Sequence, residues 1–147
     1  MPRRSPSQAG PSTSCEIRIV NDMSEIARVA ELVDRFGAEH AFSNEVITAL
    51  NVSLDEIINN IISYGYEDAG RHDIMVRMEV RGDSVEVVVE DDAKPFDPLT
   101  VAAPGPHSPE RLGGVGIHFV RKLTDQLKYT RRDGINRLWL MKKLTRQ

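Results

Sequence analysis

Apolar and polar residues follow two patterns along the chain, one typical of strands and one typical of helices. Residues 16–20 alternate between the two kinds and predict a strand. Apolar residues then recur at helical spacing over 24–39, and again over a longer stretch between Ser43 and Gly65. Ser43 is the expected cap of this second helix. Gly65 is its expected end, because glycine takes the left-handed conformation that ends helices at low cost.

The second half of the chain predicts strands in pairs. Valines at alternate positions on both sides of Gly82 and Asp83 predict a hairpin, and runs at about 127–132 and 137–143 flank a second turn. Between the pairs lies an irregular stretch longer than ordinary connections, as functional lids often are. The glycine run at 113–116 then opens a third helix. This order favours an α+β fold, a two-layer sandwich in which helices cover one face of a mixed, mostly antiparallel sheet.

Composition places this fold in one domain of ordinary size. The chain has 147 residues, and its first 15 are rich in Pro, Ser and Gly, so we expect a disordered extension at 1–15 and a folded domain at 16–147. The extension lacks the apolar segment of a signal peptide, and no apolar run approaches the roughly 18 residues of a membrane span. Cys15 is the only cysteine, which excludes an intrachain disulfide and fits a cytoplasmic protein.

The net charge of −3 gives no bulk attraction to nucleic acid or to an anionic membrane. Residues 118–147 nevertheless hold nine Lys and Arg against only Asp125 and Asp133. Solvated strand faces explain this excess, and a nucleic-acid patch is the less favoured alternative, because few aromatic residues are present for base stacking. We therefore expect no direct contact with nucleic acid and none with a membrane.

Polar residues interrupt the second predicted helix in the stretch DEIINNIISYGY, residues 55–66. Glu56 and Asn60 are four residues apart, so they lie on one flank, about 40° apart and at the border of the apolar stripe. Such a pair either is satisfied by water or forms a site. In a site, the amide oxygen of Asn60 would ligate Mg²⁺ and the Glu56 carboxylate would accept a proton from an attacking hydroxyl.

Two later segments offer partners for this pair. The glycines at 113–116 allow a phosphate to approach the backbone closely at the start of a helix, although a flexible hinge explains them equally simply. Asp91 ends a strand of alternating apolar residues, where it either belongs to a turn or accepts a hydrogen bond from an exocyclic amine.

Taken together, these segments resemble the ATP-binding domain shared by gyrase, Hsp90, histidine kinases and MutL, the GHKL or Bergerat fold. The match lies in LDEIINNIISYGY, VEDDAKPFDP and GGVGIHFVRKL, and it covers about residues 16–144. The branch it resembles is that of the anti-sigma factor serine/threonine-protein kinases. The resemblance to this branch rests on Tyr64-Gly65-Tyr66, on PFDP after the acidic pair, and on the closing YTRRDGINRLWLMKKL.

The resemblance implies a role for each matching position. Glu56 matches the general base, Asn60 the Mg²⁺ ligand and Asp91 the aspartate that holds the adenine amine. The phosphates would be bound by the backbone of Gly114, Val115 and Gly116 and, at the terminal phosphate, by Arg111. Ala93 stands where the family usually has a glycine, and its methyl group costs little only if its φ is negative.

The resemblance therefore implies an ATP- and Mg²⁺-dependent protein serine/threonine kinase that regulates transcription. It would phosphorylate a small antagonist protein on Ser or Thr and bind a sigma factor. The alternative is a nucleotide-gated binding module that orders its lid around ATP and transfers little or no phosphate. Relatives of this kind often form dimers, so a homodimer is one assembly that the resemblance allows.

Overall fold

Five strands form one antiparallel sheet in the order β1-β2-β3-β5-β4. The computed structural model describes residues 13–100 and 111–145, with the side chains of all of these except 100 and 111–115. The strands are β1 (Ser14–Val20), β2 (Asp73–Arg81), β3 (Ser84–Asp91), β4 (Gln126–Arg132) and β5 (Ile135–Lys143). All four strand pairings are antiparallel. The sheet is thus antiparallel throughout and not mixed as predicted, because every strand runs opposite to the strand beside it.

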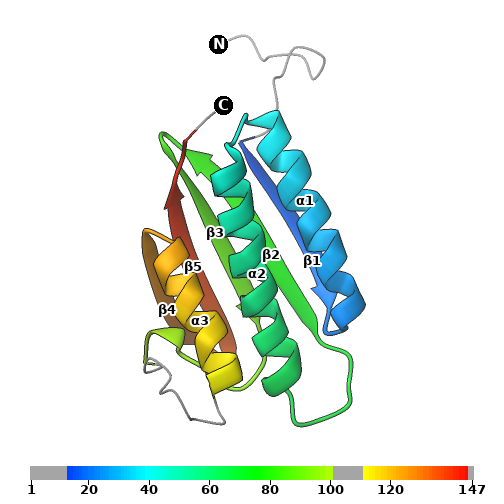
Figure 1. Cartoon of the computed structure of the whole chain (residues 1–147). Coiled ribbons are helices and arrows are strands. Elements are labelled where there is room, and N and C mark those ends of the chain that lie inside the picture. The colour runs from blue at the N-terminus through cyan, green and yellow to red at the C-terminus, as the bar shows by residue number, and fades with distance from the viewer. Residues whose placement is uncertain (1–12, 101–110, 146–147) are drawn as a thin grey trace.

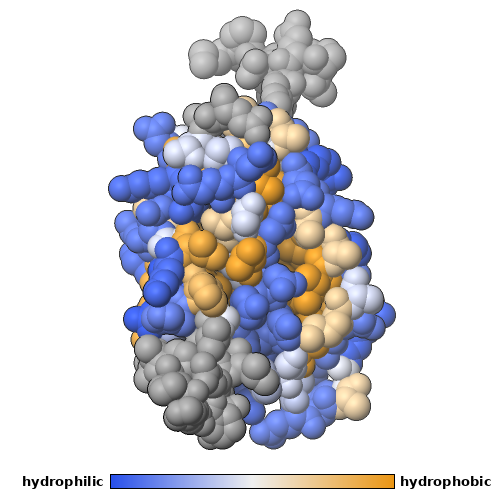
Figure 2. Space-filling view, viewed as in Figure 1, coloured by the Kyte–Doolittle hydropathy of each residue, from blue (hydrophilic) through white to orange (hydrophobic). Residues whose placement is uncertain are grey.

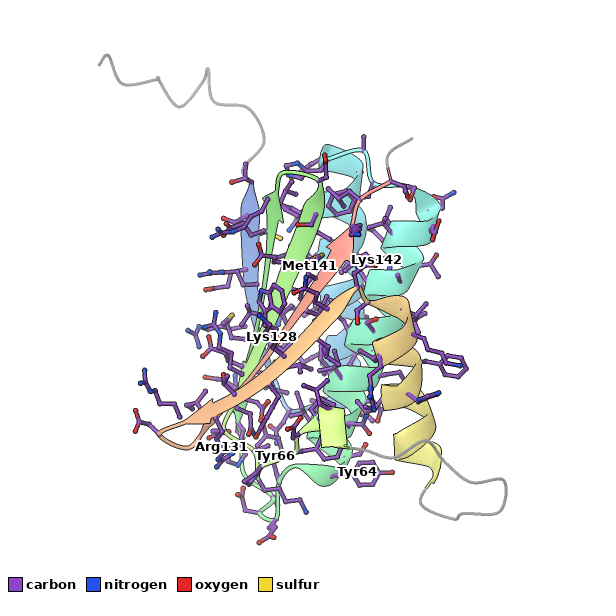
Figure 3. The ribbon with its side chains drawn as sticks, turned by 90° about the vertical axis from the view of Figure 1, so that its left-hand side faces the viewer. Tyr64, Tyr66, Lys128, Arg131, Met141 and Lys142 are labelled. Atoms are coloured by element: carbon purple, nitrogen blue, oxygen red, sulfur yellow. The ribbon has the colours of Figure 1, made fainter. Side chains whose placement is uncertain are left out.

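Three helices cover one face of this sheet, and the other face stays open (Figures 1 and 3). They are α1 (Ile26–Glu39), α2 (Asn44–Tyr64) and α3 (Arg111–Leu123), with short 3₁₀ turns at η2 (Met23–Glu25) and η3 (Pro98–Thr100). In Figure 1, α2 runs between α1 and α3. The predicted two-layer α+β sandwich is therefore confirmed.

The strands alternate as their sequences predict. Val85, Val87 and Val89 of β3 are buried on the face of the sheet that the helices cover. Leu54 and Ile58 of α2 are buried in the same core. One hydrophobic cluster joins the two layers and includes residues of all three helices and of the sheet. This cluster forms the core that holds α2 in place over the centre of the sheet.

The chain boundaries differ in detail from the sequence prediction. β1 begins at Ser14, so Ser14 and Cys15 pair with β2 and do not belong to an extension. Residues 1–12 of the predicted extension lie outside the described residues, as do residues 101–110 of the predicted lid. Asp133 and Gly134 join β4 to β5 with φ values of 53° and 78°, which is the two-residue turn that suits the twist of a hairpin.

The helical face carries apolar side chains at its surface, separated by hydrophilic ones (Figure 2). Val52 of α2 is 40% exposed and Phe119 of α3 is 53% exposed. On the open face, Trp139 of β5 donates from its indole nitrogen to Glu86 at 2.8 Å, and the Lys128 ammonium lies 5.2 Å from its ring centre. No helix in the described part of the chain is both long and apolar enough to cross a bilayer.

Candidate functional site

Glu56 of α2 lies directly against Gly116 of α3. A Cβ atom at Gly116 would overlap the carboxylate oxygen Oε2 of Glu56 and would come within 2.6 Å of its Cδ. Gly116 is buried and Glu56 is half-buried. The structure thus brings the predicted general base and the predicted phosphate-binding segment into contact, although 60 positions separate them in the sequence.

The end of α2 makes a second close approach, to the segment after β3. A Cβ at Gly65 would lie 2.6 Å from the Cβ of Ala93 and would overlap the Ile61 carbonyl oxygen. The Lys94 amide donates to the Gly65 carbonyl at 2.9 Å. Gly65 ends the helix as predicted, but its φ is −84°, so the expected left-handed conformation was wrong. Space, and not backbone conformation, explains the glycine.

Asn60 lies between these two approaches on α2, one turn after Glu56, which is about 6 Å along the axis. Its amide nitrogen is buried and has no hydrogen-bond partner. Buried polar atoms are nearly always paired, so this amide nitrogen, which can only donate, needs an acceptor that the described residues do not supply. The neighbouring Asn59 instead accepts a hydrogen bond from Ser63 on the exposed side of the helix, at 2.9 Å.

These oxygen donors fit Mg²⁺. In the part of the chain that the structure describes, no group of three or more His, Cys, Asp or Glu side chains could enclose a metal ion. Mg²⁺ commonly takes one or two protein oxygens and completes its shell with water and phosphates. The amide oxygen of Asn60 would supply one such ligand, and the remaining ligands would come with the nucleotide.

Asp91 is the buried acid of the site, with 6% of its surface exposed. Its Oδ1 accepts hydrogen bonds from the Ala93 amide at 3.0 Å and from the side-chain nitrogen of Asn136 at 2.9 Å. Burial raises the pKa of Asp91, while the Asn136 and Ala93 hydrogen bonds oppose that rise. The two hydrogen bonds therefore hold the carboxyl group in one orientation, while burial makes its ionised form less favourable.

Ala93 adopts a conformation open to any residue. Among the described residues other than glycine, only Ala41 and Asp133 have a positive φ. Ala93 is 3% exposed, and its carbonyl accepts from Asn136 and from Arg131, both at 2.9 Å. The methyl group in place of the usual glycine thus imposes no backbone strain, and it packs against Gly65.

The loop between α2 and β2 adds a cluster that the sequence prediction did not include. His72 stacks on Tyr66 with ring centres 4.2 Å apart. Its two ring nitrogens contact Asp68 at 2.9 Å and Asp92 at 3.1 Å. These carboxylate contacts, that with Asp68 first, raise the pKa of His72. Burial, together with the carboxylates of Asp91 and Asp92, raises the pKa of the Tyr66 hydroxyl, which is itself buried without a partner.

The phosphate end of the predicted site is described only in part. The glycine run at 113–116 was predicted to precede the third helix. It lies inside α3 instead, because the helix begins at Arg111. The first intrahelical bond runs to the fourth residue of the helix, so the helical amides left without a partner are those of 111–113, and the amides of Gly114 and Gly116 lie beyond them. The side chains of Arg111 and Val115 lie outside the described side chains, so their predicted phosphate contacts stay predictions.

Asn136 is the residue that the sequence prediction missed. It is 5% exposed and lies opposite Asp91 in the pairing of β3 with β5. The signal was present, because Asn136 occupies an inward position of a strand whose next inward residues are Leu138 and Leu140. A polar residue at a core position needs buried partners, and here the partners belong to the site.

Comparison with known proteins identifies one matching family, distant relatives in sequence and a solved structure of the same fold. The family model described as "Histidine kinase-like ATPase domain" matches residues 19–142. Serine-protein kinase RsbW of Bacillus velezensis is 23% identical over 127 residues, which are 82% of this chain and 79% of that protein. Serine/threonine-protein kinase BtrW of Bordetella bronchiseptica is 28% identical over 112 residues, 74% of this chain and 75% of that protein.

A solved structure shares the fold. The RsbU and RsbW domains of Rv1364c from Mycobacterium tuberculosis superpose with a TM-score of 0.69 at 17% identity. The superposition covers 93% of this chain and 34% of that one, so the chain spans about a third of the solved protein. At this identity the likeness concerns the arrangement of helices and strands alone.

Proposed function

Because the chain belongs to the histidine kinase-like ATPase family, whose model matches residues 19–142, we propose that it binds ATP with Mg²⁺ and phosphorylates a partner protein on Ser or Thr. The single observation that carries this proposal is the contact between Glu56 and Gly116. It places a carboxylate that could accept a proton beside the glycine run in the first turns of α3, where the missing side chains would let a phosphate approach closely.

Three described residues would contribute to phosphoryl transfer in this proposal. Asp91 would accept a hydrogen bond from the exocyclic amine of adenine beside the C-terminal end of α2. Glu56, about two turns before that end, would accept the proton of the attacking hydroxyl, and Asn60 between them would hold Mg²⁺. The metal neutralises charge on the phosphates, which with positioning accounts for most of the catalysis in such reactions.

The acceptor and the other partners follow from the relatives. RsbW of Bacillus velezensis and BtrW of Bordetella bronchiseptica are named as serine-protein and serine/threonine-protein kinases, which supports a hydroxyl acceptor on a protein. We propose that the acceptor belongs to a small antagonist protein and that a sigma factor is the alternative partner. The protein would then regulate transcription in the cytoplasm by exchanging partners, as a monomer or a homodimer.

The negative φ of Ala93 bears on the alternative of a binding module without transfer. That alternative drew support from the missing glycine, and the backbone at 93 carries no strain that would exclude a bound nucleotide. Binding and transfer nonetheless use the same residues, so the two functions are separated by experiment.

The test is transfer of label from γ-labelled ATP to a candidate antagonist protein, with wild type and Glu56→Gln. We expect Glu56→Gln to reduce transfer by about 10²-fold or more while ATP still binds, since general-base catalysis contributes on this scale. Asp55→Asn is the matched control, because Asp55 is the exposed neighbour on the same helix. Equal transfer by wild type and Glu56→Gln would refute the assigned base. Tight, ATP-dependent partner binding without label transfer would establish the binding module instead.

The metal ligand is tested by titrating ATP calorimetrically with and without Mg²⁺. For wild type we expect Mg²⁺ to strengthen ATP binding, and for Asn60→Ala we expect that gain to be largely lost. Asn59→Ala removes the same amide one position away, on the exposed side where it accepts from Ser63, and should keep the gain. Identical Mg²⁺ dependence in the two variants would show that Asn60 is not the metal ligand.

A further inference from the structure

The segment that follows β3 is held from the side by the hairpin of β4 and β5. The side-chain nitrogen of Asn136 lies within hydrogen-bond distance of three acceptors, which share its two N–H groups: Oδ1 of Asp91 and the Ala93 carbonyl, both at 2.9 Å, and the Lys94 carbonyl at 3.1 Å. Arg131 donates to the same Ala93 carbonyl at 2.9 Å. The hairpin therefore fixes both the Asp91 carboxylate and the two residues that follow it.

The orientation of the Asn136 amide is set by its other end. Its oxygen accepts from Arg131 at 2.8 Å and from the Tyr129 hydroxyl. A guanidinium can only donate, so the group facing it must be the amide oxygen. The nitrogen then has to point at Asp91, and the assignment of oxygen and nitrogen in this side chain follows from its partners.

Only one of the two carboxylate oxygens of Asp91 accepts hydrogen bonds from the described residues. Both hydrogen bonds that the described residues give to the carboxylate, from Asn136 and from the Ala93 amide, end on Oδ1. Oδ2 is the oxygen that can accept a bond from a bound nucleotide. Figure 3 shows Arg131 and Tyr66 at the same end of the molecule, where β4 and the loop after α2 border this segment.

We propose that Asn136 is a positioning residue that sets the purine preference of the site: it holds the Asp91 carboxylate by Oδ1 so that Oδ2 accepts from a 6-amino purine and opposes a 6-oxo purine. This inference rests on the proposed function, because it concerns the same nucleotide site. An adenine amino group donates to a carboxylate oxygen. A guanine 6-oxo group only accepts, so it would meet an unprotonated Asp91 as one acceptor against another.

Ionisation of Asp91 is what this preference depends on. Burial of Asp91 and, to a smaller extent, the charge of Asp92 just after the strand favour the protonated acid, whereas Asn136, the Ala93 amide and Arg131 favour the carboxylate. Besides burial, the charge of Asp91 raises the pKa of Tyr66, which lies on the loop after α2. A protonated Asp91 would donate from its carboxyl group and could accommodate a 6-oxo purine. Loss of the Asn136 donor should therefore move the loss of preference to higher pH.

The experiment is calorimetric titration of the whole protein with ATP and with GTP between about pH 5 and about pH 8, for wild type and Asn136→Ala. We expect wild type to prefer ATP throughout the upper part of this range. In Asn136→Ala we expect the ratio of ATP to GTP affinity to fall about tenfold or more, as for a lost hydrogen bond to a charged group. The pH midpoint of the remaining ATP preference should also rise.

A second variant guards against a simple folding defect. Tyr129→Phe keeps Asn136 and removes one of the two donors that orient its amide, so a smaller change of the same sign is expected. If Asn136→Ala does not fold, Tyr129→Phe carries the test by itself, with a circular-dichroism melt as the check on folding.

The outcomes separate this inference from the function on which it rests. Wild type that binds neither nucleotide overturns both. Wild type that binds ATP, together with variants that weaken ATP and GTP equally at an unchanged pH midpoint, overturns the positioning role and leaves the kinase proposal intact. An unchanged ratio and midpoint in both variants has the same meaning.

Discussion

The carboxylate of Glu56 occupies the space that a side chain at Gly116 would fill. The two residues come from different helices, and their contact defines where α3 lies against α2. A glycine at this point has a steric explanation that does not involve conformational freedom, because position 116 lies within a regular helix. The contact therefore links the catalytic assignment of Glu56 to the packing of the helices.

Replacement of Gly116 by alanine should separate activity from stability. The new methyl group would push the flexible end of Glu56 aside, which costs little, and alanine favours a helix over glycine by up to about 1 kcal/mol. We expect Gly116→Ala to melt at the wild-type temperature or above it and to lose most phosphoryl transfer. Transfer of labelled phosphate and a circular-dichroism melt measure the two effects on the same sample.

The double variant with Glu56→Ala provides the control for that result. If Gly116→Ala acts by displacing Glu56, it adds no further loss of transfer once Glu56 is already absent. Full transfer by Gly116→Ala alone would show that the Glu56 position in this structure is irrelevant to the reaction.

Gly65 should be far less tolerant than Gly116. A methyl group at 65 meets the Cβ of Ala93 at 2.6 Å and a backbone carbonyl, neither of which can swing away. We expect Gly65→Ala to destabilise the fold by about 1 to 3 kcal/mol, the usual range for overpacking. Denaturant unfolding measures this change.

The compensating variant is Gly65→Ala combined with Ala93→Gly, which removes one of the two clashes. Part of the lost stability should return, whereas Ala93→Gly in the wild-type background should not improve ATP affinity, since φ at 93 is not positive. ATP binding that rises from undetectable to micromolar in Ala93→Gly would show that the methyl group blocks the site.

The sequence predicted most of the fold because its patterns are local. Alternation in 85–89 and helical spacing between Ser43 and Gly65 each specify one element and its buried face. The resemblance in turn placed Glu56 and Asp91. What it could not supply was the contact of Asn136 with Asp91, because that depends on β5 pairing with β3 in one register. The start of α3 was missed for a related reason: glycine lowers helix propensity, and packing on α2 overrides it.

We expect Asp91→Asn to stabilise the fold at neutral pH and to abolish ATP binding. Burial raises the pKa of Asp91 above that of the unfolded chain, so the folded protein binds the proton more tightly and loses stability as pH rises through the window between the two pKa values. An uncharged asparagine keeps an oxygen for Asn136 and Ala93 and avoids this loss. We expect a higher melting temperature at neutral pH and no ATP binding.

Melting curves across pH check the sign of this effect. The advantage of Asp91→Asn over wild type should shrink as pH falls toward the usual pKa of aspartic acid, where Asp91 becomes protonated. A constant difference at every pH would mean that the charge of Asp91 does not limit stability.

His72 should give the fold the opposite dependence on pH. Its contacts with Asp68 and Asp92 raise its pKa above the ordinary 6.5, so their stabilisation is complete below about pH 6.5 and is lost as pH rises through the higher folded value. We expect His72→Gln to reduce stability below pH 6.5 and to have little effect in alkaline solution. Denaturant unfolding at several pH values measures the difference, with the partly exposed His118→Gln as the matched control.

The hairpin of β4 and β5 follows the other strands along the chain, yet it supplies the neighbour of β3 and the amide that orients Asp91. A truncated polypeptide that ends before residue 135 would expose the edge of β3 to other chains and leave Asp91 without its Asn136 contact. Deletions that remove this hairpin should therefore produce aggregation-prone fragments instead of partially active ones.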